Sequence, residues 1–136
     1  QELELLPRVL SFSYSNSNRI TILHAGVTPN FTWEDLKYNE SVCYIRTIDE
    51  LSKMIKLVWV IKDGKPELVP EKNGTNWHEL YDGRFGYIVA GHAAQKDGIP
   101  KFFKNSCNLD TCAYETGILT AGLFGINGLE EIIQAK

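Results

Sequence analysis

Short apolar runs separated by turn-forming residues dominate the hydrophobic pattern of this chain. Runs rich in β-branched and aromatic residues cover positions 19–23, 57–61 and 87–90. Such short runs are typical of buried β-strands. Asp-Gly and Asn-Gly pairs, which tolerate the positive φ of tight turns, lie at positions 63–64, 73–74, 82–83, 97–98 and 127–128. The pattern therefore predicts a mostly β fold and argues against a helical bundle.

Two brief segments are helix candidates. A helix over 47–56 is favoured because Thr47 and Glu50 have the spacing of a capping box. The segment 128–135 is the second candidate, and a strand fits it equally well. We expect a mostly β domain, or an α+β domain with one or two short helices.

Landmarks recur in the same order in the two halves of the chain. Residues 4–7 resemble 67–70, residues 20–26 resemble 88–94, and Cys43-Tyr44 corresponds to the segment 112–114. A repeated order of landmarks at an offset near half the chain length indicates internal duplication. We therefore predict a single domain over 1–136, built as a pseudo-twofold unit from repeats at approximately 1–62 and 63–136.

Composition and net charge indicate which kinds of binding partner to expect. The chain has 136 residues, 43% of them hydrophobic and 23% charged, which is ordinary for one globular domain. Its 17 acidic and 14 basic side chains give a net charge of −3, which repels phosphate backbones, so we expect no nucleic-acid partner. Its apolar runs are far shorter than a bilayer requires, and we expect no membrane partner.

Two features of the sequence predict secretion. The chain starts at Gln1 without a Met or an apolar leader, as expected after removal of a signal peptide. Three Asn-X-Ser/Thr triplets place candidate glycans on Asn30, Asn39 and Asn73. Together these features predict an extracellular glycoprotein.

The three cysteines, Cys43, Cys107 and Cys112, cannot all pair within one chain. Cys107 and Cys112 enclose a four-residue polar loop that a local disulfide could close. Cys43 would then be free and buried, or it would bridge to another chain and make a homo- or hetero-oligomer. No histidine stands at a zinc-ligand spacing from these cysteines, so we expect no metal and no cofactor.

The order of several motifs in the second half resembles the DM-nine repeat. The residues that carry the resemblance are Trp59, the segment 66–70, Tyr81-Asp82-Gly83, Tyr87-Ile88, the region of Ala93, the segment 98–101 and Tyr114-Glu115. Proteins of that family usually carry two tandem repeats in one pseudo-symmetric β-rich unit, and several are mannose-binding lectins. The resemblance implies a secreted carbohydrate-binding protein of mannose type.

The resemblance also implies site residues. Asp82 in the Asp-Gly turn and Lys101 after Pro100 would hold sugar hydroxyls, the carboxylate as acceptor and the ammonium as donor. The duplication places Asn18 and Lys37 at the corresponding positions of the first half. Trp77 lies in a polar stretch and is the tryptophan best placed to stack on a sugar ring at the surface. In a purely structural reading, Asp82 forms a turn and Lys101 is a solvated charge.

Two other functions remain open on the sequence. His24 and His92 end apolar strands at matching places, and such a pair could perform the acid–base chemistry of a small secreted hydrolase of ribonuclease type. Histidines bonded to backbone groups are the structural alternative. A subunit linked to a partner chain through the unpaired cysteine is the third function. Because no complete catalytic motif is present, we assign no catalytic residue.

Overall fold

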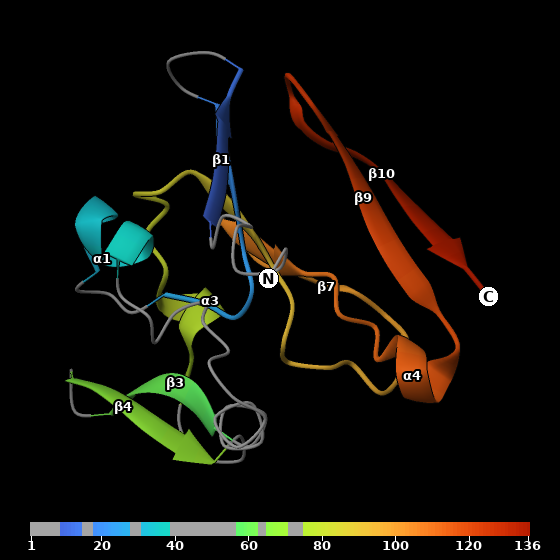
Figure 1. Ribbon diagram of the computed structural model, residues 1–136, viewed down its shortest axis with the longest axis horizontal. Helices are drawn as coiled ribbons and strands as arrows, with labels where there is room; N and C mark the ends of the chain where they lie inside the picture. Colours follow the sequence, from blue (N-terminus) through green and yellow to red (C-terminus); the bar gives the residue numbers. More distant parts are fainter. Residues whose placement is uncertain (1–8, 15–17, 28–30, 39–56, 63–64, 71–74) are drawn as a thin grey trace, which may run out of the picture.

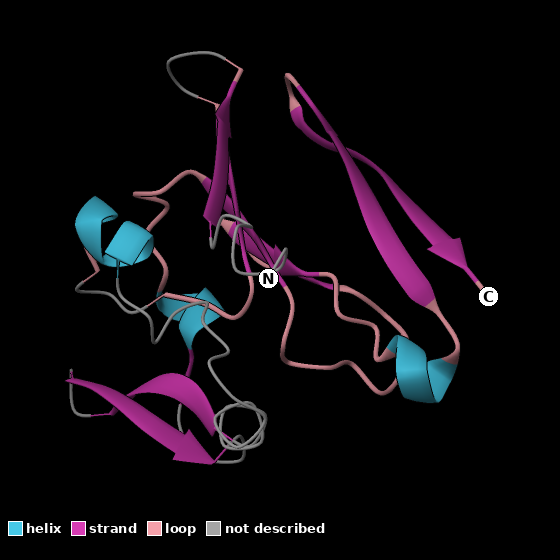
Figure 2. Cartoon of the chain, in the orientation of Figure 1, coloured by secondary structure: helices cyan, strands magenta, loops and turns pink. Residues whose placement is uncertain are grey.

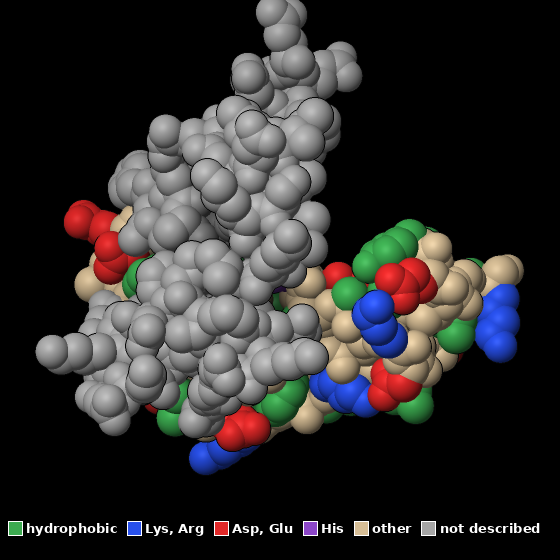
Figure 3. All heavy atoms as spheres, turned by 90° about the horizontal axis from the view of Figure 1, so that it is seen from below, with side chains coloured by type: hydrophobic (Ala, Val, Ile, Leu, Met, Phe, Trp, Pro, Cys, Tyr) green, Lys and Arg blue, Asp and Glu red, His purple; other side chains and the backbone are tan. Residues whose placement is uncertain are grey.

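The computed structural model describes residues 9–14, 18–27, 31–38, 57–62, 65–70 and 75–136. Strands make up 42% of the structure and helices 14%, which confirms the mostly β class predicted from the sequence (Figure 2). Acidic and basic side chains are interspersed on the described part of the face shown in Figure 3.

A five-stranded mixed sheet forms the centre of the fold, in the order β1-β2-β6-β8-β7 (Figure 1). Its strands are β1 (Val9–Ser13), β2 (Arg19–Leu23), β6 (Tyr87–Ala90), β7 (Lys101–Phe102) and β8 (Ser106–Asn108). The three inner strands β2, β6 and β8 are parallel, whereas β1 and β7 are antiparallel to their neighbours. The amino ends of the inner strands therefore share one edge of the sheet, and their carboxyl ends share the opposite edge.

One face of this sheet packs against two short helices, α1 (Trp33–Tyr38) and α3 (Trp77–Leu80). Thr32 and Asp35 cap α1 reciprocally, because the Asp35 carboxylate accepts from Thr32 N at 2.7 Å and Thr32 Oγ1 accepts from Asp35 N at 3.2 Å. Leu36 of α1 is buried in the same cluster as Ile88 and Phe85. This cluster is the main core of the described structure.

The other face packs against a long hairpin of β9 (Leu119–Gly125) and β10 (Gly128–Ala135). Phe124 of β9 contacts a buried cluster formed by Ile20, Val89 and Cys107. Figure 1 shows the hairpin on the side of the sheet opposite α1 and α3. The segment 128–135 is thus a strand, and the predicted Asn-Gly turn at 127–128 connects it to β9.

A smaller sheet has the order β4-β3-β5. It consists of β3 (Leu57–Lys62), β4 (Lys65–Pro70) and β5 (Thr75–Asn76), and it leads directly into α3. The last helix, α4 (Ala113–Thr116), precedes the hairpin. Within the described part of the chain, no helix is long and apolar enough to span a bilayer.

Several predictions fall outside the described residues. These are the helix over 47–56, the candidate glycosylation sites Asn30, Asn39 and Asn73, and Cys43. Of the repeated landmarks, the segments near His24 and His92 lie side by side as the parallel strands β2 and β6. The pseudo-twofold relation between the two halves stays a prediction.

Candidate functional site

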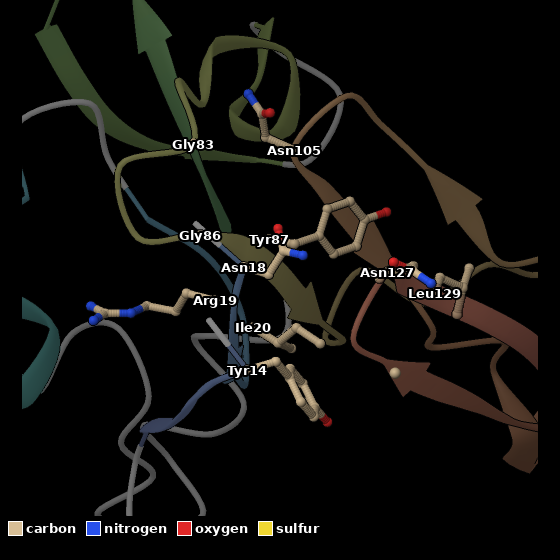
Figure 4. Close-up of a pocket in the computed structure, with 12 residues that line it drawn as sticks. Tyr14, Asn18, Arg19, Ile20, Gly83, Gly86, Tyr87, Asn105, Asn127 and Leu129 are labelled. Carbon is tan, nitrogen blue, oxygen red and sulfur yellow. The ribbon is translucent and has the colours of Figure 1, made fainter. Parts of the chain in front are cut away.

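An open groove of about 430 Å³ lies at the amino ends of the parallel strands. Several elements meet there: the start of β2, the loop before β6, the residue that precedes β8, and the turn of the β9–β10 hairpin (Figure 4). Its polar and aromatic lining comes from Tyr14, Asn18, Tyr87, Asn105 and Asn127. The site thus joins segments that are far apart in the sequence.

Gly86 brings the loop before β6 close to the start of β2. Its φ of +82° lies in the left-handed region. A Cβ at this position would overlap the carbonyl oxygen of Arg19. Only glycine combines this backbone conformation with this close approach. Gly86 therefore positions Tyr87 beside Asn18 in the groove.

Two asparagines of the groove are fixed by backbone carbonyls. Asn18 Nδ2 donates to the Ile126 carbonyl at 2.6 Å, and Asn105 Nδ2 donates to the Tyr81 carbonyl at 3.0 Å. Asn127 is exposed in the turn of the hairpin. Each amide carries both a donor and an acceptor. The groove thus presents amide groups that come from three separate segments.

Two tyrosines give the groove its aromatic character. The Tyr87 hydroxyl donates to the Ser106 carbonyl at 3.0 Å, and burial raises the pKa of Tyr87 well above its usual range. The Tyr14 hydroxyl donates to the Phe124 carbonyl at 3.2 Å, and 47% of Tyr14 is exposed. The Tyr87 hydroxyl therefore stays neutral at physiological pH.

Arg19 is the one charged residue among the described residues that line the groove. Its guanidinium carbon lies 4.6 Å from the centroid of the Trp33 ring, and its Nε donates to Ser13 Oγ at 3.2 Å. Figure 4 shows this side chain directed away from the other labelled groove residues. The groove therefore offers neutral polar groups to a ligand.

The predicted pair of Asp82 and Lys101 is not brought together. Asp82 binds Arg84, with the shortest contact at 2.6 Å, and this partner lowers the pKa of Asp82. Lys101 donates to Asp97 at 2.6 Å. Lys101 lies opposite Asn108, at the carboxyl edge of the sheet, whereas Asp82 adjoins the groove at the amino edge through Gly83. The two side chains thus belong to opposite edges.

The prediction that Trp77 is a surface residue was wrong. Only 8% of Trp77 is exposed, because its ring packs against Gly26 and stacks on His78 at 3.7 Å. The local sequence is polar, but α3 turns this ring into the main core. Lys37 lies in α1, and its side chain is outside the described structure. Of the predicted sugar-binding residues, Asn18 lines the groove.

Cys107 and Cys112 are both free and buried. The disulfide predicted between them is therefore not formed in this structure. Cys107 lies in β8, where burial raises the pKa of its thiol to about 11. Cys112 follows β8 in a left-handed conformation, with a φ of +57°. A link to a partner chain through Cys43 stays a prediction.

A second polar cluster follows the carboxyl ends of the same three strands. His24 comes directly after β2, His92 two residues after β6, and Asp110 two residues after β8. His24 Nε2 and His92 Nδ1 are 3.1 Å apart and form a hydrogen bond. Partial burial and His92 lower the pKa of His24, while Asp110 acts in the opposite direction.

The sequence indicated the two histidines but not Asp110. Nothing in the sequence shows that β8 lies next to β6, so the proximity of Asp110 became evident only in the fold. With their nitrogens hydrogen-bonded to each other, the histidines leave no space between them for a phosphate. An in-line ribonuclease reaction needs acid and base on opposite sides of the phosphate, which this arrangement does not provide. The described residues contain no group of three or more potential metal ligands.

Comparison with known proteins gives no relative. No family model matches the chain, and neither curated proteins nor solved structures match it. The resemblance to the DM-nine repeat therefore stays a prediction. The case for function depends on the geometry of the two edges of the sheet.

Proposed function

We propose that this protein is a secreted carbohydrate-binding protein that holds a neutral, mannose-type sugar in the groove at the amino edge of its central sheet. The observation that supports this proposal most is the lining of that groove. Amide groups and tyrosine rings converge there, while the guanidinium of Arg19 is stacked on Trp33 outside it.

The chemistry of this lining matches a sugar. Neighbouring hydroxyls of a hexose need donors and acceptors at once, and the side chains of Asn18, Asn105 and Asn127 provide both. The apolar face of a hexose can lie against the ring of Tyr14 or Tyr87. A volume of about 430 Å³ is within the usual range for small-molecule sites.

The proposal changes the roles of the residues predicted from sequence. Asn18 contributes to the site directly, and Asp82 supports it through the turn that contains Gly83. Lys101, at the opposite edge of the sheet, has no role in the proposed site. The glycosylation triplets and the resemblance to the DM-nine repeat support the assignment to secreted, mannose-binding proteins.

Binding of methyl α-mannoside, measured by isothermal titration calorimetry, tests the proposal. Tyr14→Ala and Asn127→Ala each remove an exposed groove side chain, and we expect either change to weaken binding about tenfold. Lys101→Ala is the matched control, and its affinity should equal that of the wild type. If wild type binds no neutral glycan on a glycan array, or if Lys101→Ala alone abolishes binding, the proposal fails.

A further inference from the structure

We infer that His78 positions the turn between β7 and β8 against α3, and that protonation of its ring opens this turn and releases sugar from the groove. This β7–β8 turn covers residues 103–106 and ends on the first residue of β8. The inference rests on the sugar-binding function proposed above and names the residue that regulates that site. Because His78 is not among the residues that line the groove, it acts through its neighbours.

The ring of His78 is enclosed in the main core, and only 4% of the residue is exposed. It lies between two aromatic rings, with centroid distances of 3.7 Å to Trp77 and 4.3 Å to Phe103. Its Nδ1 forms a hydrogen bond of 2.8 Å with the buried Oγ of Ser106. Both ends of the β7–β8 turn are therefore in direct contact with one imidazole.

The same turn carries part of the groove. Asn105, which lines the groove, lies between the two turn residues that contact His78 (Figure 4). The Ser106 carbonyl accepts from the hydroxyl of Tyr87, another groove residue, at 3.0 Å. The Asn105 carbonyl accepts from Ile88 N at 3.0 Å, which connects the turn to β6. A displacement of the turn thus moves one amide of the groove and takes away the hydrogen-bond partner of one tyrosine.

A proton on His78 is incompatible with the closed turn. Burial lowers the pKa of His78 to about 4, because a charged imidazole loses its hydration in the core. Once the turn opens and the ring reaches water, its pKa returns toward the ordinary value of 6.5. Acid therefore favours the open turn, and each pH unit between these two values shifts the equilibrium toward it by up to about tenfold.

The groups around His78 leave its own ring as the source of this acid sensitivity. Within the described residues, burial is the cause of its lowered pKa. Tyr81 at the end of α3 and Cys107 of β8 have pKa values of about 12 and about 11, so both are neutral in acid. Glu79 of α3 and Lys104 of the β7–β8 turn are exposed to solvent.

The groove itself gives a neutral sugar no reason to leave in acid. Its asparagine side chains do not titrate, and burial raises the pKa of Tyr87 well above its usual range. The charges of sugar and amides are therefore the same at neutral and acidic pH. The affinity of the groove should depend on pH through His78.

Calorimetric titration with methyl α-mannoside at a series of pH values tests the inference. In wild type we expect constant affinity above about pH 6.5 and a loss of at least about fivefold by about pH 4.5, since only the closed turn binds sugar. His78→Phe keeps an aromatic ring in the stack but cannot take up a proton, so its affinity should change less than about twofold over this range. His24→Gln is the matched control, because it removes a histidine outside the groove, and it should lose affinity in acid as the wild type does.

Hydrogen exchange at single amides follows the turn without any sugar. The N–H groups of Ile88 and Phe103 donate to carbonyls of the β7–β8 turn, whereas Gly91 N–H donates to the His24 carbonyl at the other edge of the sheet. Between about pH 6.5 and about pH 4.5, the protection factors of Ile88 and Phe103 should fall at least about tenfold in wild type. They should stay constant in His78→Phe. Retained protection of Gly91 shows that the sheet stays folded while the turn opens.

Two results would overturn the inference. One is a wild-type protein that binds the mannoside equally well, and protects Ile88 equally well, at both ends of this pH range. The other is a His78→Phe variant that loses affinity and protection as steeply as the wild type. If the wild type binds no mannoside even at neutral pH, the proposed sugar function fails, and the exchange measurement alone decides whether His78 controls the turn. His78→Leu, which cannot take up a proton either, replaces His78→Phe if the phenylalanine variant does not give a native melting curve.

Discussion

The two edges of the central sheet have opposite chemistry although the same three strands end at both. At the amino edge, amides and tyrosines from separate segments surround a neutral groove, and the guanidinium of Arg19 is stacked elsewhere. At the carboxyl edge, His24 and His92 are hydrogen-bonded to each other, and the charge of Asp110 acts on the pKa of His24. The strands hold the loops in place, and the loop residues determine what each edge can do.

The two glycines that flank β6 provide the strongest test of this difference. Gly86→Ala places a Cβ against the Arg19 carbonyl in a left-handed conformation, so we expect a loss of roughly 2–4 kcal/mol in the free energy of unfolding. At the other end, a Cβ on Gly91 meets its nearest atom at 3.6 Å, an ordinary contact. Gly91→Ala should change stability by less than about 1 kcal/mol. Urea denaturation of both variants measures the contrast, and equal losses would contradict it.

Acidic pH should destabilise the folded protein because His78 is buried in its core in the neutral form. This ring is buried between Trp77 and Phe103, its Nδ1 lies 2.8 Å from Ser106 Oγ, and burial lowers its pKa to about 4. Because the unfolded chain takes up this proton near pH 6.5 and the folded protein does not, stability is complete above that pH. It is lost as the pH falls toward 4.

The expected loss between pH 6.5 and pH 4 is roughly 3 kcal/mol, measured by urea denaturation at a series of pH values. His78→Phe retains the aromatic stack without the titrating group, and its curve should be flatter over this interval. A wild-type and a variant curve of the same slope would show that other groups cause the loss.

Asn105→Ala should have a moderate effect that is confined to the amino edge. It removes the hydrogen bond to the Tyr81 carbonyl, which contributes about 1 kcal/mol. It also removes one amide from the groove, so the affinity for methyl α-mannoside, measured by calorimetry, should fall. A folded variant that binds the sugar as tightly as the wild type would contradict this role of Asn105.

Asn127→Ala should have the smallest effect on stability. Its side chain is exposed in the hairpin turn, so the free energy of unfolding should change by less than about 0.5 kcal/mol. Sugar binding should nevertheless weaken, as expected of a residue that contacts ligand. A melting temperature that falls together with the affinity would instead indicate a structural role.

The sequence predicted those parts of the fold that depend on local pattern. The strand runs at 19–23 and 87–90 are β2 and β6, and the Asn-Gly pair at 127–128 forms the hairpin turn. The helix α1, which Thr32 and Asp35 cap, was not predicted from the sequence. Its six residues are too few for a periodic signal.

The sites were harder to predict because they depend on which strands are neighbours. Asn18 was predicted from the duplication, but its groove partners Asn105 and Asn127 lie far from it in the sequence. The hydrogen bond from Asn18 to Ile126 joins residues that are 108 positions apart. Trp77 was misplaced because the polar residues around it gave no sign that α3 faces the core. Asp82 and Lys101 were assigned to one site from the order of motifs along the chain. That order contains no information on which edge of the central sheet each residue occupies.

Mapping of backbone amide shifts by NMR during titration with methyl α-mannoside tests the central claim most directly. We predict that the amides of Asn18, Tyr87, Asn105 and Asn127 shift with one common dissociation constant, while those of His24 and His92 do not move. Shifts confined to the carboxyl edge, or no shift anywhere at millimolar sugar, would contradict the assignment of the groove as the sugar site.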